Sequence, residues 1–499
     1  RIGKRLAGAE FCAPMAAYHG HVAKLAHEAD YVFSPHYLED DDRPVGTRRN
    51  FCYYSQYAAT LAATIPDPLV RSKLLTPVLK NGERERTRIR RLVHTLRPVL
   101  GATLRWGEVA SAYRDALKTV RERKASLPRI MQEQRDKAPN ELAVVLLGRP
   151  YTVLSASMNK NIPELFGALG VRCFSQSMVE LTEAHLQSIE PLLSLIHWAY
   201  PAQTLAAAEA VASTPGLYPV IVTSFKCAPD SCAIEYVRRI LDRRGKPYLV
   251  LQLDEHDSQV GYETRIEAAL RTFRNHHASA SESKRSPSPH RAVVQEPLYD
   301  LRDRVLLLPC WDRYACTMMA ASFRREGVDA RVLEEDSLLI TQALQHNSGQ
   351  CIPLNVMVEG FVTYVKKHGL DPSRAALWTH SSQMGCNIGA FPLVMQSLLE
   401  ERGEGFEHAR VYVGQMTGKD ISMRAIANQV RVFVCAGNLR RMGCKIRPYE
   451  LEPGQTDRLL EDSLVRLARA FETGETLLPV VEEVVSRFSA IRRRDEKRP

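Results

Sequence analysis

The chain has 499 residues, 45% of them hydrophobic and 25% charged, a composition typical of a soluble globular protein with several domains. No window holds the roughly 18 consecutive apolar residues of a membrane span, and the basic start has no apolar stretch of a signal peptide. The net charge of +10 is spread along the chain, which favours a mildly basic surface over a nucleic-acid-binding tail. The missing initiator Met suggests a piece of a longer protein.

The first part of the chain predicts a small mixed unit followed by long helices. Residues 1–65 indicate helix, strand, loop and helix, with a short β-rich run at 31–37. Residues 66–138 carry apolar side chains at helical spacing between charges, which predicts a helical insert. The Arg-rich run at 84–91 is interspersed with Glu, so a solvated helix face is the better interpretation than a nucleic-acid patch.

Buried strands then alternate with helices. Apolar runs at 141–147 and 218–225 and the segment 246–256 each read as a strand, and the segments after the first two read as loops that lead into helices. Such alternation predicts a parallel sheet with right-handed crossovers. Residues 276–297 are poor in apolar residues and rich in Ser, Pro and basic residues, which is typical of a linker.

The alternating pattern restarts after the linker. Further strands are expected at 304–309, 329–335, 375–380 and 408–416, and the chain ends in helices. We therefore predict an α/β fold of Rossmann-like, doubly wound parallel sheets in two pseudo-repeated lobes with a helical insert. We expect a cysteine-bearing unit at 1–138, a second α/β unit at 139–275, a linker at 276–297 and a second lobe at 298–499.

The chain contains 11 cysteines, an odd number without a secretion signal, which argues against a disulfide framework. In a reducing cytoplasm, where we expect this protein, clustered cysteines more often bind metals or perform redox chemistry. Isolated cysteines are more often small core residues.

Two cysteines share one local pattern. Cys12 and Cys351 each begin a Cys-x-Pro sequence ahead of a helical stretch. A loop cysteine follows each of them: Cys52 lies 40 residues after Cys12, and Cys386 lies 35 residues after Cys351. A single Cys-x-Pro is most simply a packed thiol at a helix start, because Pro is common in the first helical turn. The second copy, with its own loop cysteine, favours a duplicated ligand site.

Cys227 is the third candidate of the first half, because it directly follows the strand at 218–225 and ligands bind at the carboxyl ends of parallel strands. For the second half, Cys435 and Cys444 are equally consistent with core positions. Three thiolates from separate loops suit an iron–sulfur cluster, whereas structural zinc sites usually take cysteine pairs two to four residues apart.

Other polar residues allow a functional and a structural interpretation. His19 and His21 suit a metal or proton role, or a polar helix start. Arg149 suits a clamp for phosphate or carboxylate, or a structural role. The triplet at 254–256 supplies acid–base groups or a helix cap. Dinucleotide-binding Gly-x-Gly motifs are absent, which argues against a nicotinamide enzyme.

Four segments together resemble the acyl-CoA dehydratase activase-related proteins, relatives of the 2-hydroxyacyl-CoA dehydratase components and of double-cubane-cluster proteins. They are FCAPMAAYHGHVAKL, GRPYTVLSASMNKNIPELFGALG, SFKCAPDSCAIEYVRRILDRRGKPYLVLQLDEHDSQVG and KIRPYELEPGQTDRLLEDSL. The resemblance implies that Cys12, Cys52 and Cys227 hold a [4Fe–4S] cluster with a fourth iron position open. It also implies that Cys351 and Cys386 serve a second cluster or complete a double cubane.

The resemblance further implies ATP-driven, low-potential electron transfer that reduces or dehydrates an acyl-CoA-type substrate. Family members often carry actin-like ATPase domains, but this chain shows neither their phosphate loop nor a Walker motif. An activase ATPase is therefore expected as a partner, upstream in the same chain or on another protein. No nucleic-acid or membrane partner is expected, and a homodimer is an open option. The alternatives are a non-catalytic electron relay or scaffold that docks on the activase, and a zinc-stabilised structural protein.

Overall fold

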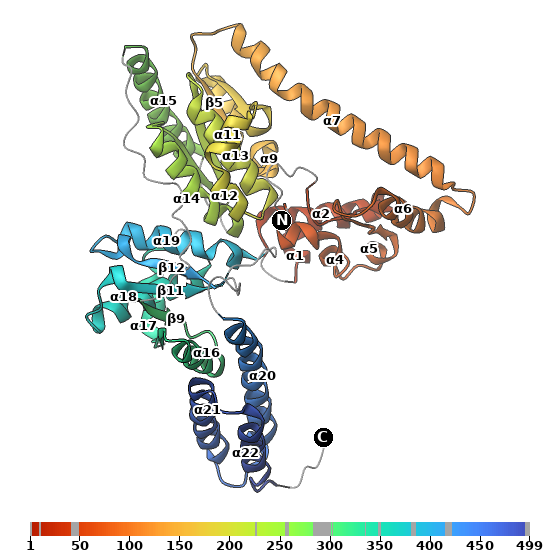
Figure 1. The fold of residues 1–499 in the computed structure, drawn as a ribbon. Coiled ribbons are helices and arrows are strands. Elements are labelled where there is room, and N and C mark those ends of the chain that lie inside the picture. Colours follow the sequence, from red (N-terminus) through yellow and green to blue (C-terminus); the bar gives the residue numbers. More distant parts are fainter. Residues whose placement is uncertain are drawn as a thin grey trace. The chain divides into compact units, whose positions relative to one another are not determined.

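In a computed structural model, contacts divide the chain into two units, residues Arg1–Gln295 with Ser382–Gly389, and Glu296–Ser381 with Ala390–Pro499 (Figure 1). The structure describes residues 2–494 apart from these positions: 9–10, 41–48, 225–226, 255–258, 283–300, 302, 335, 348–350, 381–385 and 415–421. Each unit is described by itself. Across the described ranges, no helix combines the length and the apolar character needed to cross a bilayer.

The first unit opens with short elements around a small apolar core. Its helices are α1 (Ile2–Leu6), α2 (Ala13–Glu28), α3 (Tyr53–Gln56), α4 (Ala58–Ala62) and α5 (Pro68–Lys73). Two parallel pairs of two-residue strands lie among them: β1 (Val32–Phe33) with β3 (Leu74–Leu75), and β2 (His36–Tyr37) with β4 (Val78–Leu79). The β-rich run expected at 31–37 is thereby confirmed.

The predicted helical insert contains α5, α6 (Glu85–Leu100) and α7 (Trp106–Asp136), together with the two-residue strands β3 and β4. Helix α7 is 31 residues long, and Figure 1 shows it as a single extended rod. Its first turns bury Val109 and Ala110 against α6, and its far end packs near the first large sheet, where Arg172 donates to the Gln134 carbonyl.

The first unit also holds a four-stranded parallel sheet in the order β6-β5-β7-β8. Its strands are β5 (Ala143–Gly148), β6 (Arg172–Ser175), β7 (Leu217–Ser224) and β8 (Leu249–Leu253). Three of them confirm the sequence predictions, and β6 was missed because its sequence, RCFS, has no continuous apolar run. The helices that accompany the sheet are α8 (Pro150–Val153), α9 (Ala156–Asn159), α10 (Ile162–Ala168), α11 (Glu183–Ser188), α12 (Glu190–Leu195), α13 (Ala199–Ser213), α14 (Ala228–Arg243) and α15 (Gln259–Glu282). Helix α15 continues into the first residues of the expected linker, whose remainder lies outside the described residues.

The second unit has a four-stranded parallel sheet in the order β10-β9-β11-β12. Its strands are β9 (Val305–Leu308), β10 (Asp329–Val332), β11 (Ala375–Thr379) and β12 (Arg410–Val413), which confirms all four predictions for this half. Its helices are α16 (Arg313–Arg325), α17 (Ser337–Leu344), α18 (Ile352–Lys367), α19 (Phe391–Arg402), α20 (Met423–Ile446), α21 (Gln455–Thr473) and α22 (Leu477–Ser489). One apolar cluster joins the sheet to α16, α20, α21 and α22.

The two large sheets are all-parallel and share one strand order, so the α/β class with parallel sheets is confirmed. In this arrangement β7 corresponds to β11, and the loop that reaches Cys227 corresponds to the loop that reaches Cys386. The expected similarity between the Cys12 and Cys351 segments is limited to the cysteine and the helix that follows it. Both residues precede a helix of 16 residues with Pro in its first turn, but α2 leads to a two-residue strand and α18 to a sheet strand.

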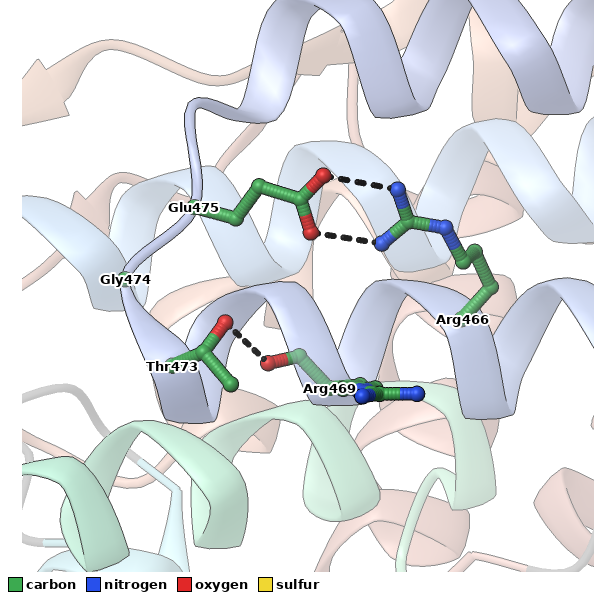
Figure 2. Close-up of a pocket in the computed structure, with 5 residues that line it drawn as sticks. All are labelled: Arg466, Arg469, Thr473, Gly474 and Glu475. Atoms are coloured by element: carbon green, nitrogen blue, oxygen red, sulfur yellow. Dashed lines mark hydrogen bonds and ion pairs between the residues drawn. The ribbon is translucent and has the colours of Figure 1, made fainter.

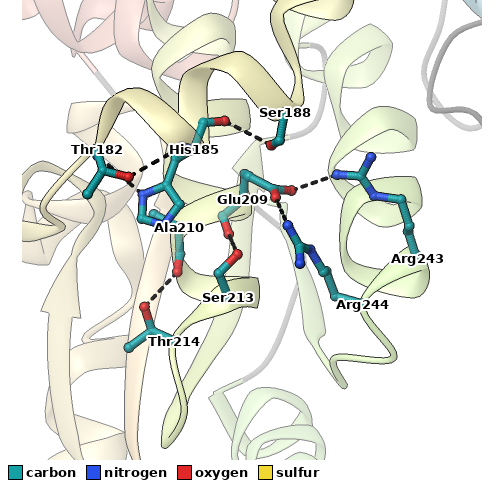
Figure 3. A network of polar contacts seen from close by, with 9 residues as sticks. All are labelled: Thr182, His185, Ser188, Glu209, Ala210, Ser213, Thr214, Arg243 and Arg244. Atoms are coloured by element: carbon teal, nitrogen blue, oxygen red, sulfur yellow. Dashed lines mark hydrogen bonds and ion pairs between the residues drawn. The ribbon is translucent and has the colours of Figure 1, made fainter. Parts of the chain in front are cut away.

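A buried carboxylate fixes α14 against α13. Glu209 on α13 is fully buried and accepts hydrogen bonds from Arg243, at 3.0 Å, and from Arg244, both at the end of α14 (Figure 3). The same view shows Ser213 bonded to the Glu209 carbonyl and the Thr182–His185 capping box at the start of α11. Because α14 begins at Cys227, this ion pair helps to position that cysteine.

We expect Glu209→Gln to destabilise the first unit by about 3 kcal/mol, because it leaves two arginines without their buried counter-charge. Urea unfolding followed by circular dichroism measures the change. The control is Glu267→Gln, an exposed position on α15, which should stay within about 0.5 kcal/mol of the parent. Equal midpoints for the two variants would show that the ion pair does not stabilise the unit.

Candidate metal centre

Three of the predicted cysteines stand at the starts of helices. Cys12, Cys52 and Cys227 are the N-cap residues of α2, α3 and α14. None of their thiols makes a capping hydrogen bond of ordinary geometry. The first turn of a helix carries unpaired N–H groups and a partial positive charge, both of which favour a negatively charged sulfur.

A short backbone bridge holds the Cys52 segment beside α13. The Asn50 N–H donates to the His197 carbonyl at 2.8 Å, and the Ala199 N–H donates to the Asn50 carbonyl at 2.9 Å. Arg49, which is almost fully buried, donates from Nη1 to two carbonyls at the end of α12, at 3.2 and 2.5 Å. These contacts place Cys52 next to the large sheet although it belongs to the small N-terminal elements.

Arg149 stands at the carboxyl end of β5 and is 3% exposed. Its Nε donates to Asp230 Oδ1 at 2.7 Å, and its guanidinium lies 5.4 Å from the centre of the Tyr200 ring. Gly148 permits this turn, because a Cβ there would lie 2.3 Å from the Val222 carbonyl oxygen of the neighbouring strand. Burial alone would lower the pKa of Arg149, but the surrounding negative groups, Asp230 foremost, raise that pKa well above its ordinary value.

The three thiols are linked through this arginine. Arg149 interacts electrostatically with Cys12, Cys52 and Cys227, and Cys12 also interacts with Cys52. Tyr151, two residues after the arginine, donates its O–H to Cys227 Sγ at 3.6 Å. The three cysteines that the sequence assigned to one site thus share Arg149 as a charged neighbour.

Burial raises the pKa of the Cys12 and Cys227 thiols. Arg149 and the first-turn N–H groups of Met15 and Asp230 favour the thiolates, but they do not outweigh the loss of solvation. These two thiols therefore stay protonated near neutral pH until a metal displaces the proton.

The donor set fits an iron–sulfur group better than a single ion. Three soft sulfur ligands come from three separate helix starts, beside a buried cation that favours a negatively charged guest. Among the described residues, no group of three or more His, Cys, Asp and Glu side chains is placed to hold a metal ion. The fit therefore rests on the chemistry of the donors and not on a metal-binding geometry.

The other predicted ligands lie elsewhere. Cys351 is the half-buried N-cap of α18 in the second unit. Cys386 is exposed and belongs by its contacts to the first unit, where its backbone accepts a hydrogen bond from the His197 imidazole. Cys435 is half-buried beside the core of the second unit, and Cys444 is exposed on α20.

For most of the remaining polar candidates, the structure supports the structural interpretation. His19 is buried, bonds the Met15 carbonyl at 2.7 Å and stacks on Phe11, as a packed helix residue does. His21 is exposed. Asp254 ends the β8 segment, and residues 255–256 lie outside the described residues.

Sequence reasoning missed the groups that surround the thiols. Asp230 and Tyr151 sit in motifs that were already singled out, three residues after Cys227 and two after Arg149, so their proximity was a usable signal. Tyr200 and Arg49 reach the site from distant segments, and their local sequence gives no such signal.

A surface hollow on α21 is no competing site. It is lined by Arg466, Arg469, Thr473, Gly474 and Glu475. Figure 2 shows that Arg466 already binds both oxygens of Glu475, at 2.7 and 2.8 Å, and that Thr473 donates to the Arg469 carbonyl. Because Arg466 and Glu475 pair with each other, they are not free to bind a ligand in this hollow.

Residues 1–179 match the CoA enzyme activase uncharacterised domain, DUF2229. The match includes Cys12, Cys52, Arg149 and Tyr151, and it ends before Cys227. The first part of the chain is thus similar to a domain associated with CoA enzyme activases. No curated protein and no solved structure matches the chain.

We expect acid to destabilise the first unit through His197, whose pKa burial lowers from 6.5 to about 4. Between those values the unfolded state binds more protons than the folded state, so stability is lost as the pH falls from 6.5 towards 4. His197→Asn should reduce this loss, measured as the pH dependence of the unfolding free energy. The control His94→Asn, at an exposed position, should retain the loss, and identical pH profiles for all three proteins would exclude His197 as the cause.

Proposed function

We propose that this chain is an iron–sulfur protein related to 2-hydroxyacyl-CoA dehydratase components. In this proposal Cys12, Cys52 and Cys227 hold a [4Fe–4S] cluster that serves ATP-dependent, low-potential reduction or dehydration of an acyl-CoA-type substrate. The proposal is supported by three cysteines that each stand at a helix start and by the buried Arg149, which has each of them as an electrostatic neighbour. The match of residues 1–179 to a CoA enzyme activase domain supports the assignment to this kind of system.

When bound, such a cluster supplies a one-electron carrier of low potential. The protein contributes the surroundings. Cys227 lies in a site where Tyr151 donates a hydrogen bond and Arg149 supplies positive charge. Burial around Arg149 keeps water from competing for these groups, so hydrogen bonds and charges act there at low dielectric.

We further propose, as the resemblance implies, that Cys12, Cys52 and Cys227 leave one iron position of the cluster open. Cys351 and Cys386 are proposed for a second cluster or for completion of a double cubane. Electrons would come from an actin-like activase ATPase, encoded upstream or as a separate protein.

An electron-relay module that docks on the activase is the second candidate. Tyr53, Tyr54 and Tyr57 follow Cys52 directly and are each at least 42% exposed. Exposed aromatic side chains beside a redox group favour contact with another protein. Adding activase, ATP and candidate acyl-CoA substrates separates the two candidates, because turnover indicates the enzyme and reduction without turnover indicates the relay.

We expect the protein, reconstituted anaerobically with iron and sulfide, to bind both and to show the brown colour of a cluster. Cys12→Ser, Cys52→Ser and Cys227→Ser should each lose most of the bound iron, because each removes one of three thiolate ligands. The control Cys444→Ser, at an exposed position on α20, should keep it. A colourless, iron-free parent protein after reconstitution would refute the proposal.

A further inference from the structure

Helix α7, the extended rod in Figure 1, has an apolar face that the described part of the first unit covers only at its two ends. Val109, Val120 and Met131 follow one another at intervals of eleven residues, or three helical turns, so their side chains lie on the same face. Val109 is 7% exposed where it packs against α6, and Met131 is 5% exposed near the other end. Val120, midway between them, is 51% exposed. A face that is buried at both ends and bare in the middle indicates a further neighbour.

The bare stretch has the spacing of a two-helix coiled coil. Five residues recur at alternating intervals of four and three: Tyr113, Leu117, Val120, Lys124 and Leu127. We call these residues the α7 seam. Apolar residues at such intervals form the line along which two helices pack, and one polar residue within it sets the register and the number of helices. The spacing therefore favours one further helix as the neighbour.

Positive charge flanks the α7 seam on both sides. Because successive residues of a helix are about 100° apart, Arg121 lies on one edge of the seam and Arg123 on the other, while Lys124 lies within it. All three cations are exposed. The acid beside them in the sequence, Glu122, lies on the opposite face and pairs there with Lys118 at 3.9 Å. A helix that complements this surface carries carboxylates beside its apolar stripe.

Two other occupants fit the α7 seam less well. A second copy of α7 would bring Arg121 and Arg123 against cations in either orientation of the two helices, and like charges repel. A flat anionic membrane would have to reach a face that protein already covers on both sides of the seam, at Val109 and Met131. A single helix, about 10 Å wide, can lie along the seam, which is about 21 Å long.

We infer that the α7 seam binds an acidic, amphipathic helix of a partner protein. Apolar side chains of that helix pack around Val120, between Leu117 and Leu127, and its carboxylates pair with Arg121 and Arg123. The inference goes beyond the proposed function and does not depend on it, because no cysteine of the candidate centre takes part. Since the cations are exposed, salt weakens the complex.

The test uses the full chain and a fluorescent peptide of about three heptads, with Leu at the seam positions and Glu at the flanking positions. Fluorescence anisotropy should show saturable binding that falls as salt is raised. Arg121→Gln with Arg123→Gln should weaken binding about tenfold, because both flanking charge pairs are lost. Val120→Asp should abolish it, because a carboxylate in the seam repels the acidic peptide and is left unpaired.

The matched control is Lys118→Gln with Arg129→Gln, which removes the same charge from the exposed opposite face of α7. Its affinity should stay within about twofold of the parent, because these side chains point away from the peptide. A peptide with Lys in place of Glu should fail to bind the parent but should bind Arg121→Glu with Arg123→Glu. Circular dichroism checks that each variant is folded, and if Val120→Asp is not, the paired Gln variants decide alone.

Other outcomes overturn the inference. Failure of the acidic peptide to bind the parent does so, as does equal affinity for the parent and for Arg121→Gln with Arg123→Gln. A dimer of the parent that Val120→Asp dissociates, seen by sedimentation equilibrium, would place a second copy on the seam instead. Binding of the parent to vesicles of phosphatidylserine and phosphatidylcholine, lost in the same variant and without peptide binding, would assign the seam to a membrane surface.

Discussion

The candidate centre depends on one short backbone bridge, between Asn50 and the start of α13. Cys12 and Cys52 belong to the small N-terminal elements, whereas Cys227 belongs to the large sheet, and the 31-residue helix α7 lies between them in the chain. Two backbone hydrogen bonds at Asn50, together with those of the Arg49 side chain, hold the small N-terminal elements against the segment between α12 and α13. A parallel bridge fixes both direction and register, so it positions Cys52, whose thiol bonds only locally to the Ser55 hydroxyl at 3.2 Å.

The second constraint is the balance between burial and charge at the thiols. Burial has the larger effect and raises the pKa of Cys12 and Cys227, while helix N–H groups and Arg149 act in the opposite direction. Such thiols are neutral when empty, and a metal bound there in place of the protons would leave thiolates whose negative charge Arg149 would offset. A site meant only for packing would need no buried guanidinium.

The sequence predicted most of the fold, because its strands are apolar runs that periodicity detects. Strand β6 escaped because Arg172 and Ser175 interrupt the pattern, and the two-residue strands are too short to give one. Cys12, Cys52 and Cys227 were grouped through local pattern and resemblance. The contacts of Arg49 and Tyr200 join segments more than fifty residues apart, and only the tertiary structure reveals such pairs.

The shared strand order of the large sheets has a consequence for the second half. In that order β9 takes the place of β5, and Pro309 and Cys310 follow β9 where Arg149 and Pro150 follow β5. Trp311 next to it packs on Trp378 at 4.6 Å, so this edge of the second sheet is aromatic where the first carries an ion pair. The first site also takes two of its three cysteines from N-terminal elements that precede both large sheets. The shared strand order therefore gives no reason to expect a second centre of the same design, and any cluster at Cys351 would need a different set of neighbours.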